Sequence, residues 1–181
     1  MNGFLQNYMG FDGRLNRQPF WISAIVLAIV GAIIQYIVLM VMGGSGVIDV
    51  QALLSSGKSA QEVADAFAGM ATKSGWAGLV TLVILAYPSA AISIKRRHDR
   101  GSAGMEVWVY LVLAALITIV QLLGLGMTTT EFNGVQFPTP TLLFNILGLV
   151  AGVLGIYLLV VMGFLKGTPG PNAYGPDPLG G

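Results

Sequence analysis

Long apolar stretches separated by short polar segments dominate the pattern of this chain. Four stretches without a charged residue are long enough for a helix across a bilayer core, which takes about 20 residues. They are Phe20–Met42, Trp76–Ile94, Val107–Met127 and Leu142–Leu165. The second contains Pro88, which removes a helical hydrogen bond and predicts a kink. The pattern predicts an all-α, integral membrane bundle of four transmembrane helices in a single membrane domain, residues 1–181.

The composition fits this class of protein. Charged residues make up 9% of the 181 residues and hydrophobic residues 55%, whereas a soluble domain carries about 25% charged residues. The net charge of +1 provides no positive field that would attract nucleic acid. The chain has no cysteine and one histidine, so thiolate chemistry is excluded and a histidine metal site is not expected. We therefore expect no metal, no cofactor and no nucleic-acid partner.

Positive charges are distributed unequally among the polar segments. If the N-terminus is cytoplasmic, seven of the nine Lys and Arg residues lie on the cytoplasmic side, all close to span ends. These are Arg14, Arg17, Lys95, Arg96, Arg97, Arg100 and Lys166, and the other side holds Lys58 and Lys73. The positive-inside rule then places both termini in the cytoplasm. This distribution predicts a multi-pass plasma-membrane protein.

The segment between the first two spans predicts a helix of its own. Ser59 and Glu62 have the spacing of a capping box. Apolar residues at 63, 67 and 70 then recur on one helical face. We expect an amphipathic helix at about residues 60–72, lying on the outer interface or packed on the bundle. It would serve as a connector or as a docking surface for a partner.

Two other polar segments are expected to lack helix. The loop Thr128–Pro140 contains Asn133-Gly134 and two prolines, which is typical of turns. The tail, residues 166–181, is rich in Gly and Pro and is expected to run as turns along the inner surface. Asn172, Tyr174 and Asp177 stand at fixed offsets in it, which favours a recognition or docking segment.

Small residues recur at helical spacing in two spans. They are Ala24, Ala28 and Ala32 in the first span and Gly148, Gly152 and Gly155 in the last. Such faces allow close packing of helices, either within one chain or between copies. No ionisable residue lies inside a predicted span, which disfavours an ion or proton pathway.

The segment between the second and third spans concentrates charge. Its basic residues are Lys95, Arg96, Arg97 and Arg100. Each could contribute about 1 kcal/mol to binding an anionic leaflet, so we expect them to bind lipid head groups and to anchor the topology. His98 and Asp99 could form an acid–base pair. Adjacent residues point in different directions, however, and no nucleophile accompanies them, so no catalytic residue and no enzyme activity is predicted.

Three motifs flank the spans in order along the chain. They are Phe11-x-Gly13-Arg14-x-x-Arg17-x-x-Phe20-Trp21, Lys95-Arg96-Arg97-His98-Asp99-Arg100-Gly101 and Gly170-x-Asn172-x-Tyr174-Gly175-Pro176-Asp177-Pro178. Together they resemble the domain-of-unknown-function family 805, a group of small bacterial inner-membrane proteins. This chain departs from the family pattern at Pro19, which replaces an acidic residue, and at Ala103-Gly104-Met105, where Ser-Gly-Trp is usual.

The resemblance implies a four-span bacterial inner-membrane protein and implies no activity. All three motifs fall on the predicted cytoplasmic face. We therefore expect Arg–Asp and Asn–backbone hydrogen bonds to tie the tail and the N-terminal segment onto the central loop.

These observations predict a cytoplasmic charged cluster that binds anionic lipid or a protein partner. The charged cluster consists of Arg14, Arg17, Lys95, Arg96, Arg97, His98, Asp99, Arg100, Asn172, Tyr174 and Asp177. The function we expect is that of a non-enzymatic accessory subunit or scaffold. The alternative is a small oligomeric transporter or channel, and a membrane enzyme acting on lipid phosphates with His98 and Asp99 is a weaker third. Expected partners are membrane lipids, a membrane-protein complex or a second copy of the chain.

Overall fold

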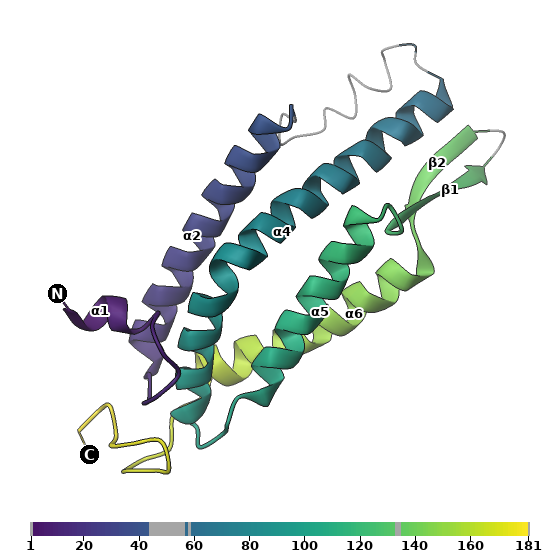
Figure 1. Ribbon diagram of the computed structural model, residues 1–181. Helices are drawn as coiled ribbons and strands as arrows, with labels where there is room; N and C mark the ends of the chain where they lie inside the picture. Colours follow the sequence, from purple (N-terminus) through teal and green to yellow (C-terminus); the bar gives the residue numbers. More distant parts are fainter. Residues whose placement is uncertain (1, 44–56, 58, 133–134, 181) are drawn as a thin grey trace. The chain divides into compact units, whose positions relative to one another are not determined.

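The computed structural model describes residues 2–43, 57, 59–132 and 135–180. Its helices are α1 (Asn2–Gln6), α2 (Arg17–Val41), α4 (Ala60–His98), α5 (Met105–Leu122) and α6 (Leu142–Leu159), as Figure 1 shows. A π-helix, η1 (Val160–Phe164), continues α6. Two strands, β1 (Met127–Phe132) and β2 (Val135–Pro140), lie between α5 and α6 in the sequence.

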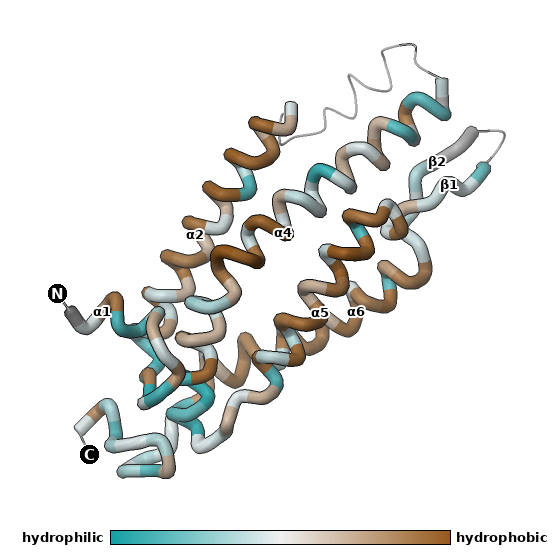
Figure 2. Tube along the Cα trace, viewed as in Figure 1, coloured by the Kyte–Doolittle hydropathy of each residue, from teal (hydrophilic) through white to brown (hydrophobic). Residues whose placement is uncertain are grey.

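Four helices are long and apolar enough to cross a membrane. They are Arg17–Val41, Gln61–His98, Met105–Leu122 and Leu142–Phe164. Apolar residues cover most of α2, α5 and α6 in Figure 2. The four predicted spans are therefore confirmed as four long apolar helices. The third ends at Leu122 and not at the predicted Met127, which begins β1. Their orientation across a membrane stays a prediction.

Residues 60–72 are helical, as predicted, but they form the first turns of α4 and not a helix of their own. The capping box is present, since the Glu62 carboxylate accepts hydrogen bonds from the Ser59 amide (2.7 Å) and hydroxyl (2.8 Å). No proline interrupts the chain between this box and the apolar stretch, so the helix has no reason to end there. It also continues on both sides of Pro88.

The all-α prediction is wrong at the loop 128–140, which contains a two-stranded antiparallel sheet. The register runs from Met127 opposite Pro140 to Phe132 opposite Val135. The β-branched run Thr128–Thr130 favours a strand. The predicted breaker Asn133-Gly134 lies outside the described residues.

The chain divides into two compact units. One unit comprises Met1–Ala32, Val83–Leu113 and Ala151–Gly181, and the other Ile33–Leu82 and Ala114–Val150. In the first unit a buried core joins residues from the N-terminal segment, α2, α4 and the end of α6. Its members are Leu15, Phe20, Ile92, Leu158 and Met162. A neighbouring buried cluster contains Ala90, Ile94 and Val107.

The small-residue faces divide between packed and open positions. Ala24 packs against the core of the first unit. A Cβ atom at Gly155 would lie 3.6 Å from the Tyr110 ring. At Gly148 and Gly152 an added Cβ would meet no described atom within 4 Å. The two latter glycines are therefore not used for close packing within the described chain.

Candidate functional site

Asp99, directly after α4, joins three segments that are far apart in the sequence. One carboxylate oxygen accepts a hydrogen bond from Arg14 Nε (3.1 Å), and the other forms an ion pair with Arg96. The Asp99 main-chain oxygen accepts from the Thr168 amide (2.8 Å) and hydroxyl (3.1 Å). The Arg14, Arg96 and Asp99 side chains are 1%, 0% and 4% exposed. Burial of two guanidinium groups is tolerated because the carboxylate and several carbonyl groups surround them.

Arg14 ties the N-terminal segment to the tail. Its two terminal nitrogens donate to the Gly170 and Thr168 carbonyls, each at 2.6 Å. A planar guanidinium with five donors suits such multiple contacts, whereas a lysine would provide one point charge. The described part of the tail, residues 166–180, has no helix, so these bonds account for much of its fixed position.

Arg96 binds the carbonyl groups that η1 leaves at the end of the last helix. The carbonyls of the last turn of a helix have no partner within the helix. Arg96 donates to the Met162 carbonyl (2.6 Å) and to the Leu165 carbonyl. Trp21 Nε1 donates to Gly163 (3.0 Å), and Arg17 donates to Phe164 (3.2 Å). Side chains from α2 and α4 thus satisfy four consecutive carbonyl groups, residues 162–165.

The remaining basic residues of the central segment are also engaged. Lys95 Nζ donates to the Gln6 and Met9 carbonyls, each at 2.6 Å, at the end of α1. Arg97 forms an ion pair with Glu106 at the start of α5. Arg100 donates to the Lys166 carbonyl at 2.7 Å.

His98 and the tail form a second contact. Its ring stacks on Tyr174 with centroids 3.8 Å apart and planes 6° apart. Nδ1 lies 3.2 Å from the Gly13 carbonyl, which can only accept, so Nδ1 carries a proton. The Asn172 side chain donates to the His98 carbonyl at 3.0 Å. His98 and Asn172 thus position the tail. The Asp99 carboxylate is bound by Arg14 and Arg96 and not by the neighbouring His98 ring.

Asp177 closes a turn within the tail. Its two carboxylate oxygens accept from the Leu179 and Gly170 amides, each at 2.9 Å. The pKa of Asp177 is lowered from its ordinary value, first by the Leu179 amide, then by the Gly170 amide and the nearby Arg14 charge. The carboxylate form therefore stabilises the turn.

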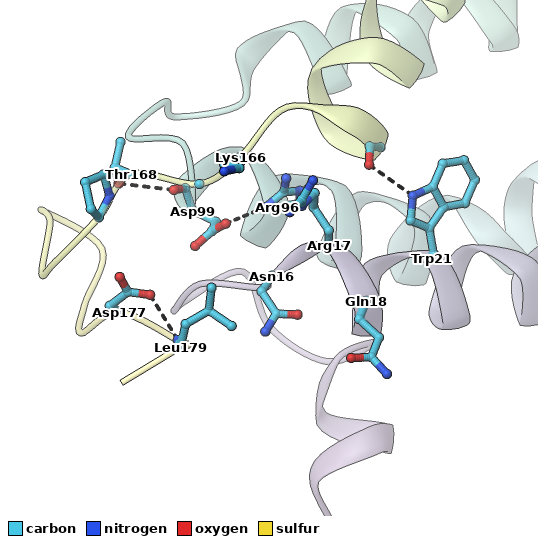
Figure 3. A pocket seen from close by; sticks show the side chains of 13 residues that line it. Asn16, Arg17, Gln18, Trp21, Arg96, Asp99, Lys166, Thr168, Asp177 and Leu179 are labelled. Carbon is cyan, nitrogen blue, oxygen red and sulfur yellow. Dashed lines mark hydrogen bonds and ion pairs between the residues drawn. The ribbon is translucent and has the colours of Figure 1, made fainter. Parts of the chain in front are cut away.

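A cavity of about 720 Å³ lies between the start of α2, the end of α4 and the chain that follows η1 (Figure 3). We call it the cavity hereafter. It is lined by Asn16, Arg17, Gln18, Trp21, Arg96, Asp99, Gly163, Lys166, Gly167, Thr168, Pro169, Asp177 and Leu179. Arg17, Gln18 and Lys166 are exposed, whereas Arg96 is buried. The cavity is therefore lined by one cation that is buried and bonded within the protein, Arg96, and by two that solvent can reach, Arg17 and Lys166.

The structure brings all the residues of the charged cluster to one end of the first unit. Both expected kinds of bond, Arg–Asp and Asn–backbone, are present there. Lys95 and Arg97 are each 8% exposed and Arg96 is 0% exposed. These three side chains are not available to a lipid head group, whereas Arg17 is exposed.

Several residues of this site were missed by the sequence analysis. Lys166 was counted for topology but not for the site, and Thr168 and Trp21 were not expected to bond. Gly167 is required because an added Cβ would lie 2.7 Å from Asp99 Cγ. At Gly163 it would lie 2.6 Å from the Trp21 ring. A single sequence carries no signal for such close approaches beyond the presence of glycine.

Comparison with known proteins identifies the family. The family model described as "Protein of unknown function (DUF805)" matches residues 8–176. Uncharacterized protein YiiR of Escherichia coli (strain K12) is 28% identical over 167 residues, 92% of this chain and 84% of YiiR. Inner membrane protein YhaI of the same organism is 23% identical over 174 residues, 96% of this chain and 90% of YhaI. No solved structure matches the chain.

The family match and the fold agree on location. YhaI is named an inner membrane protein, and this chain has four helices suited to crossing a membrane. The predicted multi-pass inner-membrane location is thereby confirmed. The chain belongs to the DUF805 family of proteins of unknown function.

Proposed function

We propose that the chain is a non-enzymatic accessory subunit or scaffold whose tail presents a docking surface to a protein partner in the cytoplasm. The supporting observation is that buried charged residues hold the C-terminal tail in place, although the described part of the tail forms no helix. Arg14 and Asp99 bind the tail at Thr168 and Gly170, while exposed residues such as Ala173 and Pro178 face outward. A surface that is already ordered loses little conformational entropy when a partner binds.

The contacts of Asp99 and His98 support a non-enzymatic role. A general acid or base must reach the proton that it transfers. The Asp99 carboxylate is held by Arg14 and Arg96, and the His98 ring lies under Tyr174 with Nδ1 on the Gly13 carbonyl. A role in positioning the tail accounts for both groups.

Site-specific photocrosslinking in cells tests the docking surface. A photoreactive amino acid at Ala173, exposed on the tail, should give one discrete protein adduct. The matched control is Val153, an exposed apolar position on α6, which should face lipid. No adduct from Ala173, or the same adducts from both positions, would contradict the proposal.

Reporter fusions test the cytoplasmic orientation separately. A fusion at the C-terminus should report the cytoplasm, and one at Lys58, outside the described residues, should report the other side. The reverse pattern would place the tail away from a cytoplasmic partner.

A further inference from the structure

We propose that the cavity binds the phosphate and polar head group of a membrane phospholipid. This site goes beyond the protein-docking role and does not depend on it, because its cations, Arg17 and Lys166, are not among the exposed tail residues assigned to docking.

Two exposed cations provide the charge that a phosphate requires. Arg17 uses one terminal nitrogen to donate to the Phe164 carbonyl (3.2 Å), and this contact fixes its side chain at the cavity wall. The described hydrogen bonds leave its other nitrogens for a ligand. Lys166, from the chain after η1, lines the same cavity and is exposed. Guanidinium and ammonium groups are the usual protein ligands of phosphate oxygens.

The acidic residues on the cavity wall do not cancel these charges. Asp99 is compensated by Arg14 and Arg96, and Asp177 accepts from two backbone amides with Arg14 at 4.0 Å. Arg17 and Lys166 are left to attract an anion.

The start of α2 adds a second contribution. The helix begins at Arg17 and is 25 residues long, so its first amides have no helical acceptor and its dipole favours an anion. Pro19 contributes no amide, and the two residues before it, Arg17 and Gln18, both line the cavity.

A hydrogen-bond acceptor without a donor indicates that the ligand carries a donor group beside its phosphate. Among the described residues, Asn16 Oδ1 is buried and has no hydrogen-bond donor. Asn16 lines the cavity. A buried acceptor without a donor costs about 1–3 kcal/mol. A hydroxyl or ammonium of the head group would supply the missing donor, which the ionised phosphodiester itself lacks.

The depth of the cavity favours lipid over a soluble phosphate compound. Trp21 lies one turn into α2, and Lys166 directly follows the last apolar stretch. Trp residues and span-end cations are enriched at the head-group level of a bilayer. Basic pockets between transmembrane helices at this level suit anionic head groups.

Native mass spectrometry of the purified full-length chain tests the site. The protein is loaded with phosphatidylglycerol or phosphatidylcholine, and the lipid retained on release from detergent is measured. We expect preferential retention of phosphatidylglycerol, with retention falling about fivefold for Arg17→Gln or Lys166→Gln, the effect of one basic side chain near anionic lipid. Lys73→Gln, which removes the same charge from the other unit, is the matched control and should change nothing.

Substitutions at Gln18 keep the test valid if Arg17→Gln or Lys166→Gln fails to fold. Gln18 is exposed on the cavity wall. Gln18→Glu should lower phosphatidylglycerol retention, and Gln18→Lys should raise it. If all variants retain the same amount of phosphatidylglycerol, the lipid is bound non-specifically at the protein surface and the proposal is overturned.

Soluble competitors distinguish the two sources of phosphate. Excess glycerol 3-phosphate or inorganic phosphate should not displace the retained lipid. Displacement with the same dependence on Arg17 and Lys166 would assign the cavity to a soluble phosphate compound instead. Crosslinking at Ala173 is independent of these measurements, so either proposal can fail alone.

Discussion

Arg96 and Lys166 are both basic residues at the end of an apolar stretch, yet the structure uses them differently. Arg96 is fully buried, pairs with Asp99 and donates to carbonyls at the end of η1. Lys166 is exposed on the cavity wall. The positive-inside rule counts the two charges equally. Arg96 is therefore occupied by Asp99 and by carbonyl groups, whereas Lys166 is available to a ligand.

The largest expected effect comes from removing the shared carboxylate of the buried arginines. Asp99→Asn leaves the buried Arg96 without its ion-pair partner and Arg14 with only Asp177 at 4.0 Å. It should lower the free energy of unfolding by about 3–5 kcal/mol. Unfolding by sodium dodecyl sulfate from mild detergent micelles measures it.

Asp65→Asn is the control for Asp99→Asn, since Asp65 is exposed. It should change the unfolding free energy by less than about 0.5 kcal/mol. The chain has no cysteine, so a spin label on Ala173→Cys reports the tail alone. Its mobility should rise in the Asp99→Asn background, and an immobile label would contradict the role assigned to Asp99.

A smaller effect is expected from crowding the same carboxylate. Gly167→Ala places a Cβ 2.7 Å from Asp99 Cγ, and overpacking of this kind costs about 1–3 kcal/mol. Gly148→Ala is the control because an added Cβ there meets no described atom within 4 Å. Equal unfolding free energies for the two variants would show that Asp99 can move freely, against its assigned fixed position.

The stacked contact between His98 and Tyr174 should contribute less. Tyr174→Ala removes the ring contact and should cost about 0.5–1.5 kcal/mol of tail docking. The mobility of the label at Ala173→Cys measures it. Tyr174→Phe retains the ring and should keep the label immobile. If the mobility rises equally in both variants, the effect belongs to the hydroxyl, and if it rises in neither, the stack does not hold the tail.

The smallest effect is a pH dependence of the tail turn. Because the pKa of Asp177 is lowered in the folded chain, the carboxylate stabilises the turn at all pH values above its ordinary pKa. This contribution is lost as the pH falls below about 4, through the lowered pKa. The label should become more mobile in that range, and Asp177→Asn should remove this part of the change. An unchanged pH profile in Asp177→Asn would contradict the role of this carboxylate.

The apolar pattern predicted the four long helices, because helices long enough to cross a bilayer must be apolar along most of their length. The sequence also indicated that the segments around Arg14, Asp99 and Asn172 meet, since all three flank spans on the same predicted side. The structure places them in contact. Span order predicted the shared side, and the three motifs indicated which residues meet there.

Other features depended on contacts that one sequence does not encode locally. The burial of Lys95 and Arg96 results from carbonyl groups of α1 and η1, which lie more than 60 residues away. The continuity of α4 is not evident from the sequence, because the pattern changes from amphipathic to apolar near Trp76. The strands β1 and β2 are not expected, because Asn133-Gly134 and the two prolines are typical of turns. Strand pairing depends on a partner segment as well as on local propensity.

One paired measurement tests the central difference between buried and accessible charge. Arg96→Gln and Lys166→Gln each remove one positive charge, and both the unfolding free energy and the retained phosphatidylglycerol are measured. We predict that Arg96→Gln loses stability by at least about 3 kcal/mol, while Lys166→Gln keeps stability and loses lipid about fivefold. If the folded fraction of Arg96→Gln loses lipid as Lys166→Gln does, or if both variants keep stability equally, the division into structural and ligand-binding charges is contradicted.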